Sequence, residues 1–122
     1  MIWLAVALGG ALGSVARHAV NDFFGHVVGR PGPYATATVN LIGSLVIGVL
    51  AGLLAGGRIH ESAAMRAFVF VGVLGGFTTF SSFMLDTFTL AEGHSVAAAF
   101  LNVALQVVVG YAAAYTGFKT FV

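Results

Sequence analysis

The sequence predicts an all-α membrane protein with four transmembrane helices, and three observations lead to this fold class. Of the 122 residues, 59% are hydrophobic and only 7% are charged, whereas soluble domains carry about 25% charged residues. The chain has 17 glycines, and glycine is commoner in membrane helices than in soluble ones. The apolar residues fall into four stretches. The alternative is an unusually apolar soluble core or subunit interface, but so few charges could not cover the surface of a soluble globule.

Each of the four stretches is close to the length of about 20 residues that a helix needs to cross a bilayer. We expect the spans at about residues 2–20, 34–54, 64–90 and 95–118, forming a single transmembrane domain over 1–122. The first is interpreted as a span and not as a secretory signal, because its start lacks positive charge and a convincing cleavage site. Two prolines and two glycines make 29–33 a loop.

Small residues recur at a spacing of four within the spans. Gly9 and Gly13 form one such pair in the first span, and Gly72 and Gly76 another in the third. Three further glycines follow the same spacing at the end of the second span, at positions 48, 52 and 56. Such spacing lets helix backbones approach closely in lipid, where hydrophobicity cannot drive helices together. We interpret it as tight packing without chemistry.

Charge placement bears on how the chain inserts. With four spans, both termini and the loop near residue 60 lie on one side, which carries Arg58, Arg66 and Lys119, whereas the other side carries Arg17 and Arg30. Orientation follows the Lys/Arg asymmetry between the two sides, and these numbers give almost no bias. Four thin helices also enclose little interior. Together these points suggest an antiparallel dual-topology homodimer of oppositely inserted copies.

Uncharged polar side chains lie at membrane depth, where they are costly and mark a pathway or a partner contact. Asn40 lies inside the second span, four residues from Thr36 and so on the same helix face. Asn102 and Gln106 have the same spacing in the fourth span. The plain alternative for Asn40 is an interhelical hydrogen bond worth about 0.6 kcal/mol. Amides can also donate hydrogen bonds to an anion, and they do not titrate.

The third span carries the run GGFTTFSSF at residues 75–83. Paired glycines followed by hydroxyl residues predict a broken third helix, whose freed carbonyls suit a hard cation such as sodium. Phe77, Phe80 and Phe83 then recur every three residues and are expected near one face. Their positive ring edges could attract an anion without offering a full charge. An aromatic stripe of this kind is more often lipid-facing or part of the packing.

The sequence lacks the chemical groups that several classes of function require. Asp22, Glu61, Asp86 and Glu92 all fall at or near span ends, whereas a proton-coupled pump needs a titratable group within the membrane. No histidine pairs with a carboxylate at metal-ligand spacing, no nucleophile–base arrangement appears, and there is no cysteine. No basic run could follow a nucleic-acid backbone. We therefore expect neither an enzyme nor a nucleic-acid-binding protein.

The run at 75–83 resembles the signature of the Fluc family of bacterial fluoride channels. The similarity extends to GGALGSVAR at 9–17, to TVNLIG at 38–43 and to the amide pair of the fourth span. The resemblance implies an antiparallel dual-topology dimer with two pores in the bacterial plasma (inner) membrane. Its partners would be the fluoride ion, the lipid bilayer and a second copy of the chain. Fluoride would leave passively, down its electrochemical gradient, which would confer fluoride resistance.

The resemblance also implies roles for individual residues. Phe80 and Phe83 match the rings whose edges line the ion path, and Asn40 matches an amide that contacts fluoride. The remaining residues offer hydroxyls or amides along that path: Thr79, Ser82, Thr36, Asn102 and Gln106.

A sodium ion and an arginine complete the expected site. The backbone carbonyls of Gly75 and Thr78 would hold a central structural Na+, with no organic cofactor, and Arg17 would lie at a vestibule or a helix end. From the residues alone, Arg17 would extend to the lipid headgroups or bond helix-terminal carbonyls. The chain departs from the family in its fourth span, where tyrosine and serine are common at the positions of Asn102 and Gln106.

Two other classes of membrane protein share features with this sequence. A small multidrug exporter is of similar size and topology, but it would need a carboxylate within its first span, and 2–16 contains none. An assembly subunit of a larger complex could carry the same glycines, but it would not need a broken third span.

Overall fold

The computed structural model describes residues 1–30 and 32–122, and within these ranges it is all-helical, without strands. Four helices are long and apolar enough to cross a membrane: Ile2–Val28, Gly32–Ala55, Ala63–Gly93 and Val96–Phe121. The predicted number and order of spans are therefore confirmed, and the chain is a multi-pass membrane protein. In order, the elements are α1 (Ile2–Val28), α2 (Gly32–Ala55), α3 (Ala63–Arg66), η1 (Ala67–Leu74), α4 (Gly75–Phe77), α5 (Phe80–Gly93) and α6 (Val96–Phe121).

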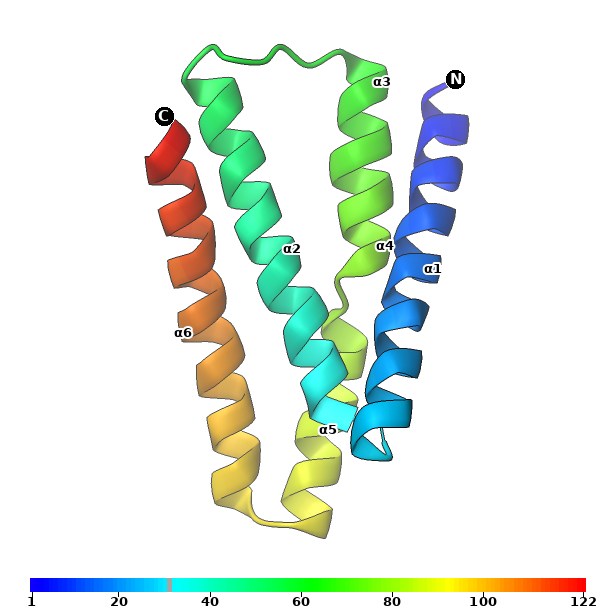
Figure 1. Cartoon of the computed structure of the whole chain (residues 1–122), viewed down its shortest axis with the longest axis vertical. Coiled ribbons are helices and arrows are strands. Elements are labelled where there is room, and N and C mark those ends of the chain that lie inside the picture. Colours follow the sequence, from blue (N-terminus) through cyan, green and yellow to red (C-terminus); the bar gives the residue numbers. More distant parts are fainter. Residues whose placement is uncertain (31) are drawn as a thin grey trace.

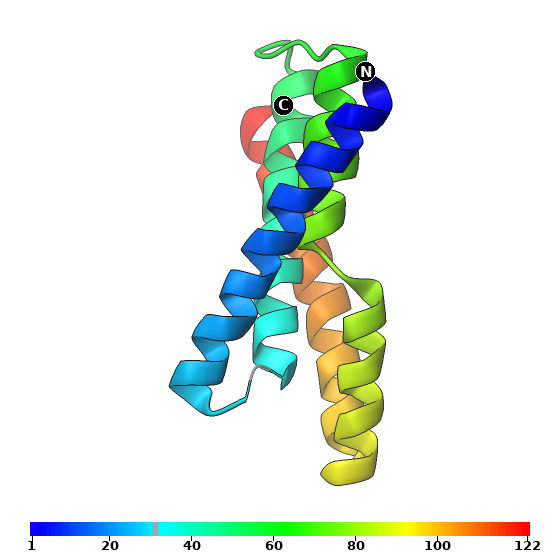
Figure 2. The same ribbon diagram turned by 90° about the vertical axis from the view of Figure 1, so that its right-hand side faces the viewer.

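The helices form two closely packed pairs. On one side α2 packs along α6, and on the other α1 packs along the π-helical segment η1 and along α4. Figure 1 shows both chain termini and the α2–α3 connection at one end of the molecule, and the α5–α6 connection at the other. The chain changes sides after α4, because α5 packs on α6. Figure 2 shows the short connection that carries the chain from α4 to α5.

The first helix is longer than the apolar stretch that predicts it. We expect its end near residue 20, but α1 continues to Val28 and ends where Gly29 adopts a left-handed conformation, with φ 83°. Bilayer thickness limits the apolar part of a helix and not the whole helix, so 21–28 extend α1 past the apolar stretch. Arg17 consequently lies about three turns before the end of α1, so of the two places expected for it, a vestibule or a helix end, the vestibule stays a prediction.

The other boundaries differ by a few residues. The expected loop at 29–33 is shorter, because α2 already begins at Gly32 and includes Pro33. Proline is tolerated in the first turn of a helix, where its missing N–H would have no helical partner. Residue 31, also in that loop, lies outside the described residues. The last helix continues to Phe121.

The glycine pattern is confirmed as a packing pattern. A Cβ atom built on Gly9 would lie 2.2 Å from the carbonyl oxygen of Phe68, and one on Gly13 would lie 2.1 Å from that of Val73. A Cβ on Gly48 would lie 2.1 Å from the Ala114 carbonyl. These contacts are with backbone, so the absent side chains let α1 approach η1, and α2 approach α6, as small residues do in membrane bundles.

The backbone of the third span departs from a regular α-helix at two places. Its first half widens into a π-helix over Ala67–Leu74, a form that is rare and frequent at functional sites; nothing in the sequence predicts it. Further on, the backbone is extended at Thr78 (φ −82°, ψ 158°) and Thr79 (φ −153°, ψ 122°), between α4 and α5.

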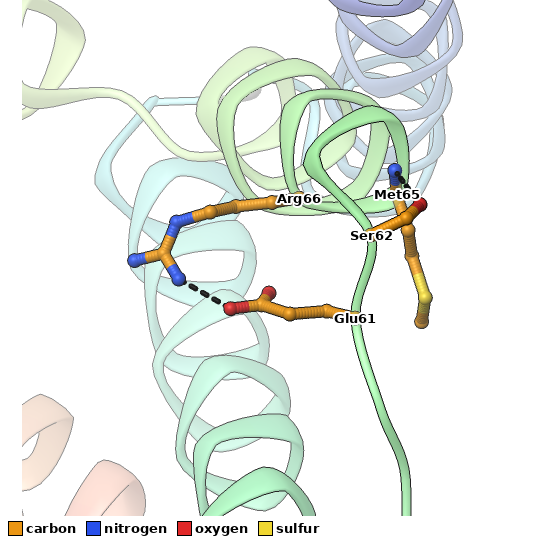
Figure 3. A network of polar contacts seen from close by, with 4 residues as sticks. All are labelled: Glu61, Ser62, Met65 and Arg66. Atoms are coloured by element: carbon orange, nitrogen blue, oxygen red, sulfur yellow. Dashed lines mark hydrogen bonds and ion pairs between the residues drawn. The ribbon is translucent and has the colours of Figure 1, made fainter.

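The connection between α2 and α3 is held by polar contacts at the end that bears both termini. Ser62 caps α3 by accepting a hydrogen bond from the Met65 N–H at 3.1 Å, and Arg66 pairs with Glu61 (Figure 3). The Arg66 guanidinium also lies 5.8 Å from the Phe70 ring centre. Such a capped helix start stabilises the turn that leads into the third span.

Candidate functional site

Two clefts of similar size lie on either side of the extended segment between α4 and α5. We call the first the phenylalanine cleft; it has a volume of about 380 Å³ and is lined by Asn40, Gly43, Ser44, Ile47, Phe70, Leu74, Gly75, Thr78, Thr79, Phe80 and Phe83. We call the second the arginine cleft; it has a volume of about 370 Å³ and is lined by Arg17, His18, Asn21, Gly32, Thr36, Val39, Thr79, Ser82, Leu85 and Asp86. Thr79 is the residue that lines both.

The structure separates the predicted site residues into three groups. Asn40, Phe80 and Phe83 line the phenylalanine cleft together with Gly75 and Thr78. Arg17, Thr36 and Ser82 line the arginine cleft. Asn102 and Gln106 line neither. Thr36 and Asn40 have helical spacing, yet they open into different clefts on either side of the Thr79 segment.

The side-chain amide of Asn40 forms two hydrogen bonds with the backbone of Thr79, one with its N–H and one with its carbonyl. The Thr79 N–H donates to Asn40 Oδ1 at 2.9 Å, and Asn40 Nδ2 donates to the Thr79 carbonyl at 3.1 Å. Thr79 is nearly buried, at 9% exposure, and an unpaired backbone group at such a place is costly. The Asn40 side chain, on α2, therefore supplies hydrogen-bond partners to the backbone of Thr79, which does not form the hydrogen bonds of a continuous helix.

Hydrogen bonds between side-chain amides connect Asn40 to α6. Asn40 Nδ2 also donates to Gln106 Oε1 at 2.8 Å, and Gln106 Nε2 donates to Asn102 Oδ1 at 3.0 Å. Asn102 Nδ2 donates to Thr87 Oγ1 at 3.0 Å, and Thr87 Oγ1 donates to the Phe83 carbonyl at 2.7 Å. The expectation that Asn102 and Gln106 share one helix face is confirmed. We refer to this connected set as the amide chain.

Thr79 also begins α5. Its hydroxyl oxygen accepts a hydrogen bond from the Ser82 N–H at 3.2 Å, and its extended conformation is that of an N-cap residue. The first N–H groups of a helix have no partner within the helix and carry partial positive charge. The start of α5 thus places N–H groups that have no partner within the helix beside the two clefts, and the hydroxyl of Thr79 accepts a hydrogen bond from one of them, that of Ser82.

The phenylalanines divide at the extended segment. Phe80 and Phe83 lie on α5 with ring centres 5.9 Å apart at 80°, an edge-to-face pair. Phe83 is buried at 6% exposure, whereas Phe80, which lines the same cleft, is 73% exposed. Phe77 belongs to α4 and lines neither cleft. The expectation that it shares a face with the other two is wrong, because helical spacing does not continue through extended residues.

The extended backbone at Thr78 and Thr79 removes a helical hydrogen bond from the carbonyl of Gly75. In a continuous helix the Thr79 N–H would donate to the carbonyl of Gly75, but here it donates to Asn40. The Gly75 carbonyl lacks that donor, and both Gly75 and Thr78 line the phenylalanine cleft. Among residues 1–30 and 32–122, no three histidine, cysteine or acidic side chains lie together in a group that could hold a metal ion.

Sequence reasoning missed three residues of this region. Asp86 is expected only as a charge at or near a span end, but it lines the arginine cleft, and its Oδ2 is buried without a hydrogen-bond partner within the described chain. Thr87 joins the amide chain, and Ser44 lines the phenylalanine cleft. Helical spacing could have found them, since Asp86, Thr87 and Ser44 each lie four residues after Ser82, Phe83 and Asn40 respectively.

Comparison with known proteins gives one consistent family. Residues 4–118 match the family described as CrcB-like protein, Camphor Resistance (CrcB). A protein of Rhodospirillum centenum named fluoride-specific ion channel FluC is 48% identical over 115 residues, which cover 93% of this chain and 90% of that protein. Fluoride-specific ion channel FluC 1 of Nitrobacter hamburgensis is 47% identical over 116 residues, covering 95% and 91%. FluC of Caulobacter vibrioides is 44% identical over 114 residues, covering 93% and 90%. The chain therefore belongs to the CrcB/Fluc family, as its motifs suggested.

Proposed function

We propose that this chain is a passive fluoride-selective channel, not an enzyme, which exports fluoride down its electrochemical gradient across the bacterial plasma (inner) membrane. The observation that supports this most directly is Thr79, a hydroxyl residue on extended backbone that borders a cleft on each side. Relatives of near-identical length bear the name fluoride-specific ion channel. An anion path needs donors that replace water yet release the ion again, and the hydroxyl and amide groups that Thr79, Ser82 and Asn40 contribute to the two clefts are neutral.

The proposed path runs from the arginine cleft past Thr79 to the phenylalanine cleft. Arg17 stands in the arginine cleft with Thr36 and Ser82, where a positive charge would draw an anion in from solution. Beyond Thr79, the edges of Phe80 and Phe83 carry positive partial charge. The first N–H groups of α5, which have no partner within the helix, add weak donors between these two regions.

We propose that a structural sodium ion belongs to the same segment. The Gly75 carbonyl has lost its helical donor, and it lines the phenylalanine cleft together with Thr78. Carbonyls freed at an interrupted membrane helix, and the negative C-terminal end of the preceding half-helix, are suited to Na+. The ion would supply positive charge that fixes the segment.

We propose that a second, oppositely inserted copy covers the phenylalanine cleft. This cleft is open and is lined by Gly75, whose carbonyl has lost its helical donor, and lipid could not supply a hydrogen bond to that carbonyl. The 73% exposure of Phe80 at its edge would end on association. The weak Lys/Arg bias of the two ends permits the antiparallel arrangement.

The decisive experiment is fluoride efflux from liposomes that contain the purified full-length chain, followed with a fluoride electrode. We expect rapid efflux that needs no proton gradient, that excludes chloride and that falls when Na+ is replaced by a large organic cation. Protein-free liposomes give the baseline. Proton-coupled uptake of an organic cation without fluoride release would instead indicate an exporter, and no transport at all would favour an assembly subunit.

The dual topology can be tested with single cysteines, because the natural chain has none. His60→Cys lies in the α2–α3 connection and His94→Cys in the α5–α6 connection, at opposite ends of the molecule, and both positions are exposed. In intact cells an impermeant thiol reagent should label roughly half of the copies at each position, since the charge bias is nearly absent. Complete labelling of one position with none of the other contradicts the antiparallel dimer.

A further inference from the structure

A histidine lines the arginine cleft, and the proposed ion path gives it no role. His18 follows Arg17 on α1, and its side chain is exposed. Among the described residues that line the two clefts, it is the one histidine. Histidine is the side chain whose charge changes between about pH 5 and pH 8. The charge of the arginine cleft therefore depends on pH in a range where the phenylalanine cleft has no titrating side chain.

The charged groups of the arginine cleft come from two helices. Arg17 and His18 belong to α1 and Asp86 to α5, whereas the residues that α2 contributes are uncharged. Neither Arg17 nor His18 forms an ion pair with a carboxylate within the described chain, and Asp86 Oδ2 is buried there without a hydrogen-bond partner. While His18 is neutral, the formal charges of Arg17 and Asp86 cancel. Protonation of His18 gives the cleft one net positive charge.

The arginine cleft opens between helices that separate. In the described part of the chain, α1 packs against η1 and α4 and does not pack against α5. Figure 2 shows α1 and α5 diverging toward the end that bears the α5–α6 connection. His18 and Asp86 line the cleft from these two helices. On the proposed path, an anion meets the charges of this cleft before it reaches Thr79.

From this arrangement we infer that His18 sets the net charge of the arginine cleft, so that protonation of His18 speeds the entry of fluoride into the proposed path. The inference rests on the proposed function, because it concerns the entrance of that path. A cleft lined by positive charge raises the local concentration of anions and their rate of arrival. The proton stays on the imidazole ring, so transport remains passive and is not coupled to proton movement.

Fluoride current across a planar bilayer tests the inference, with equal pH and equal fluoride on both sides, because neutral hydrogen fluoride carries no current. Lowering the pH from about 7.5 to about 5.5 protonates histidine. In the full-length chain this should raise the current roughly threefold at low ionic strength, the effect of one unit charge about 6 Å away in water. The increase should shrink in about 1 M of an inert organic salt, where the Debye length is about 3 Å.

Two substitutions at His18 separate its charge from its shape. His18→Gln cannot be protonated, so its current should not rise as the pH falls. His18→Lys carries its charge at both pH values, so its current should be high at both. A current that rises in His18→Gln as much as in the natural chain overturns the inference, and so does a His18→Lys current as low as that of His18→Gln.

His26→Gln is the matched control. His26 lies on the same helix, eight residues further on, is exposed and lines neither cleft. Its Nδ1 lies 3.7 Å from the carboxylate of Asp22, the acidic residue one turn after His18 on α1. His26→Gln should keep the whole increase in current at low pH. Loss of the increase in this variant would show that the response does not arise in the arginine cleft and would overturn the inference.

Equilibrium binding distinguishes failure of this inference from failure of the proposed function. The backbone N–H of Ser82, which lines the arginine cleft, can report fluoride there by NMR. In the natural chain, the fluoride concentration at half-maximal shift should be roughly threefold lower at the acid pH, whereas in His18→Gln it should not depend on pH. If this holds without any fluoride current, the proposed channel fails and the role of His18 stands. A shift that is absent or independent of pH in the natural chain overturns the inference, even where the chain conducts fluoride.

Discussion

Phe80→Ile is expected to lower the initial rate of fluoride efflux roughly tenfold or more, which corresponds to about 1.4 kcal/mol of added barrier. Isoleucine keeps an apolar surface but has no ring, so the positive ring edge that could meet an anion is lost. The edge-to-face contact with Phe83, with centres 5.9 Å apart, is lost as well. Liposome efflux measures the effect, and gel filtration of the purified variant should show the same oligomeric state as the natural chain.

Phe88→Ile is the matched control for this substitution. Phe88 lies on the same helix, eight residues further on, and is 64% exposed, close to the 73% of Phe80. It lines neither cleft, so its substitution should leave the efflux rate nearly unchanged. Equal rates for Phe80→Ile and the natural chain would remove Phe80 from the mechanism, and equal losses in both variants would show a general effect of removing phenylalanine from α5.

Gly9→Ala is expected to destabilise the protein by about 1–3 kcal/mol, the usual cost of forcing an extra carbon into a well-packed interior. The new Cβ would lie 2.2 Å from the Phe68 carbonyl oxygen and 3.0 Å from the Gly72 Cα. Both neighbours are backbone atoms and cannot rotate away, so α1 and η1 must separate. Unfolding in detergent, followed by loss of helical circular dichroism against denaturant, measures the change.

The adjacent glycine provides the control. A Cβ on Gly10 meets no atom within 4 Å, and alanine favours helix over glycine by about 1 kcal/mol in soluble hosts. Gly10→Ala should therefore be neutral or slightly stabilising. If the two neighbouring substitutions had the same effect, the close approach of α1 to η1 would not contribute to stability in the way that the structure indicates.

Several features of this protein could be predicted from the sequence because they depend on local composition. Whether a segment enters lipid depends on its own apolar length, so four spans follow without knowledge of their partners. Glycines at a spacing of four predict close helix contacts, and Gly9, Gly13 and Gly48 all make them. Helical spacing also placed Asn102 and Gln106 on one face, where they bond each other. The family followed from the run at 75–83.

Helix ends were predicted less well, because the chain beyond the apolar stretch is free to remain helical. Two further turns of α1 carry polar residues, which a hydropathy argument assigns to a loop. The π-helical segment Ala67–Leu74 also has no sequence signal. Its wider turns depend on the neighbours that the segment packs against, and α1 is the principal one.

The partners of the polar groups were decided by the tertiary structure alone. The sequence indicates that Asn40 needs hydrogen-bond partners in lipid, but not that they lie 39 and 66 residues away, at Thr79 and Gln106. Likewise, the spacing of Phe77, Phe80 and Phe83 predicts a common face only while the helix continues. Local periodicity ends where the backbone becomes extended, and from there the side chains that reach a cleft depend on how α2, α5 and α6 pack around Thr79.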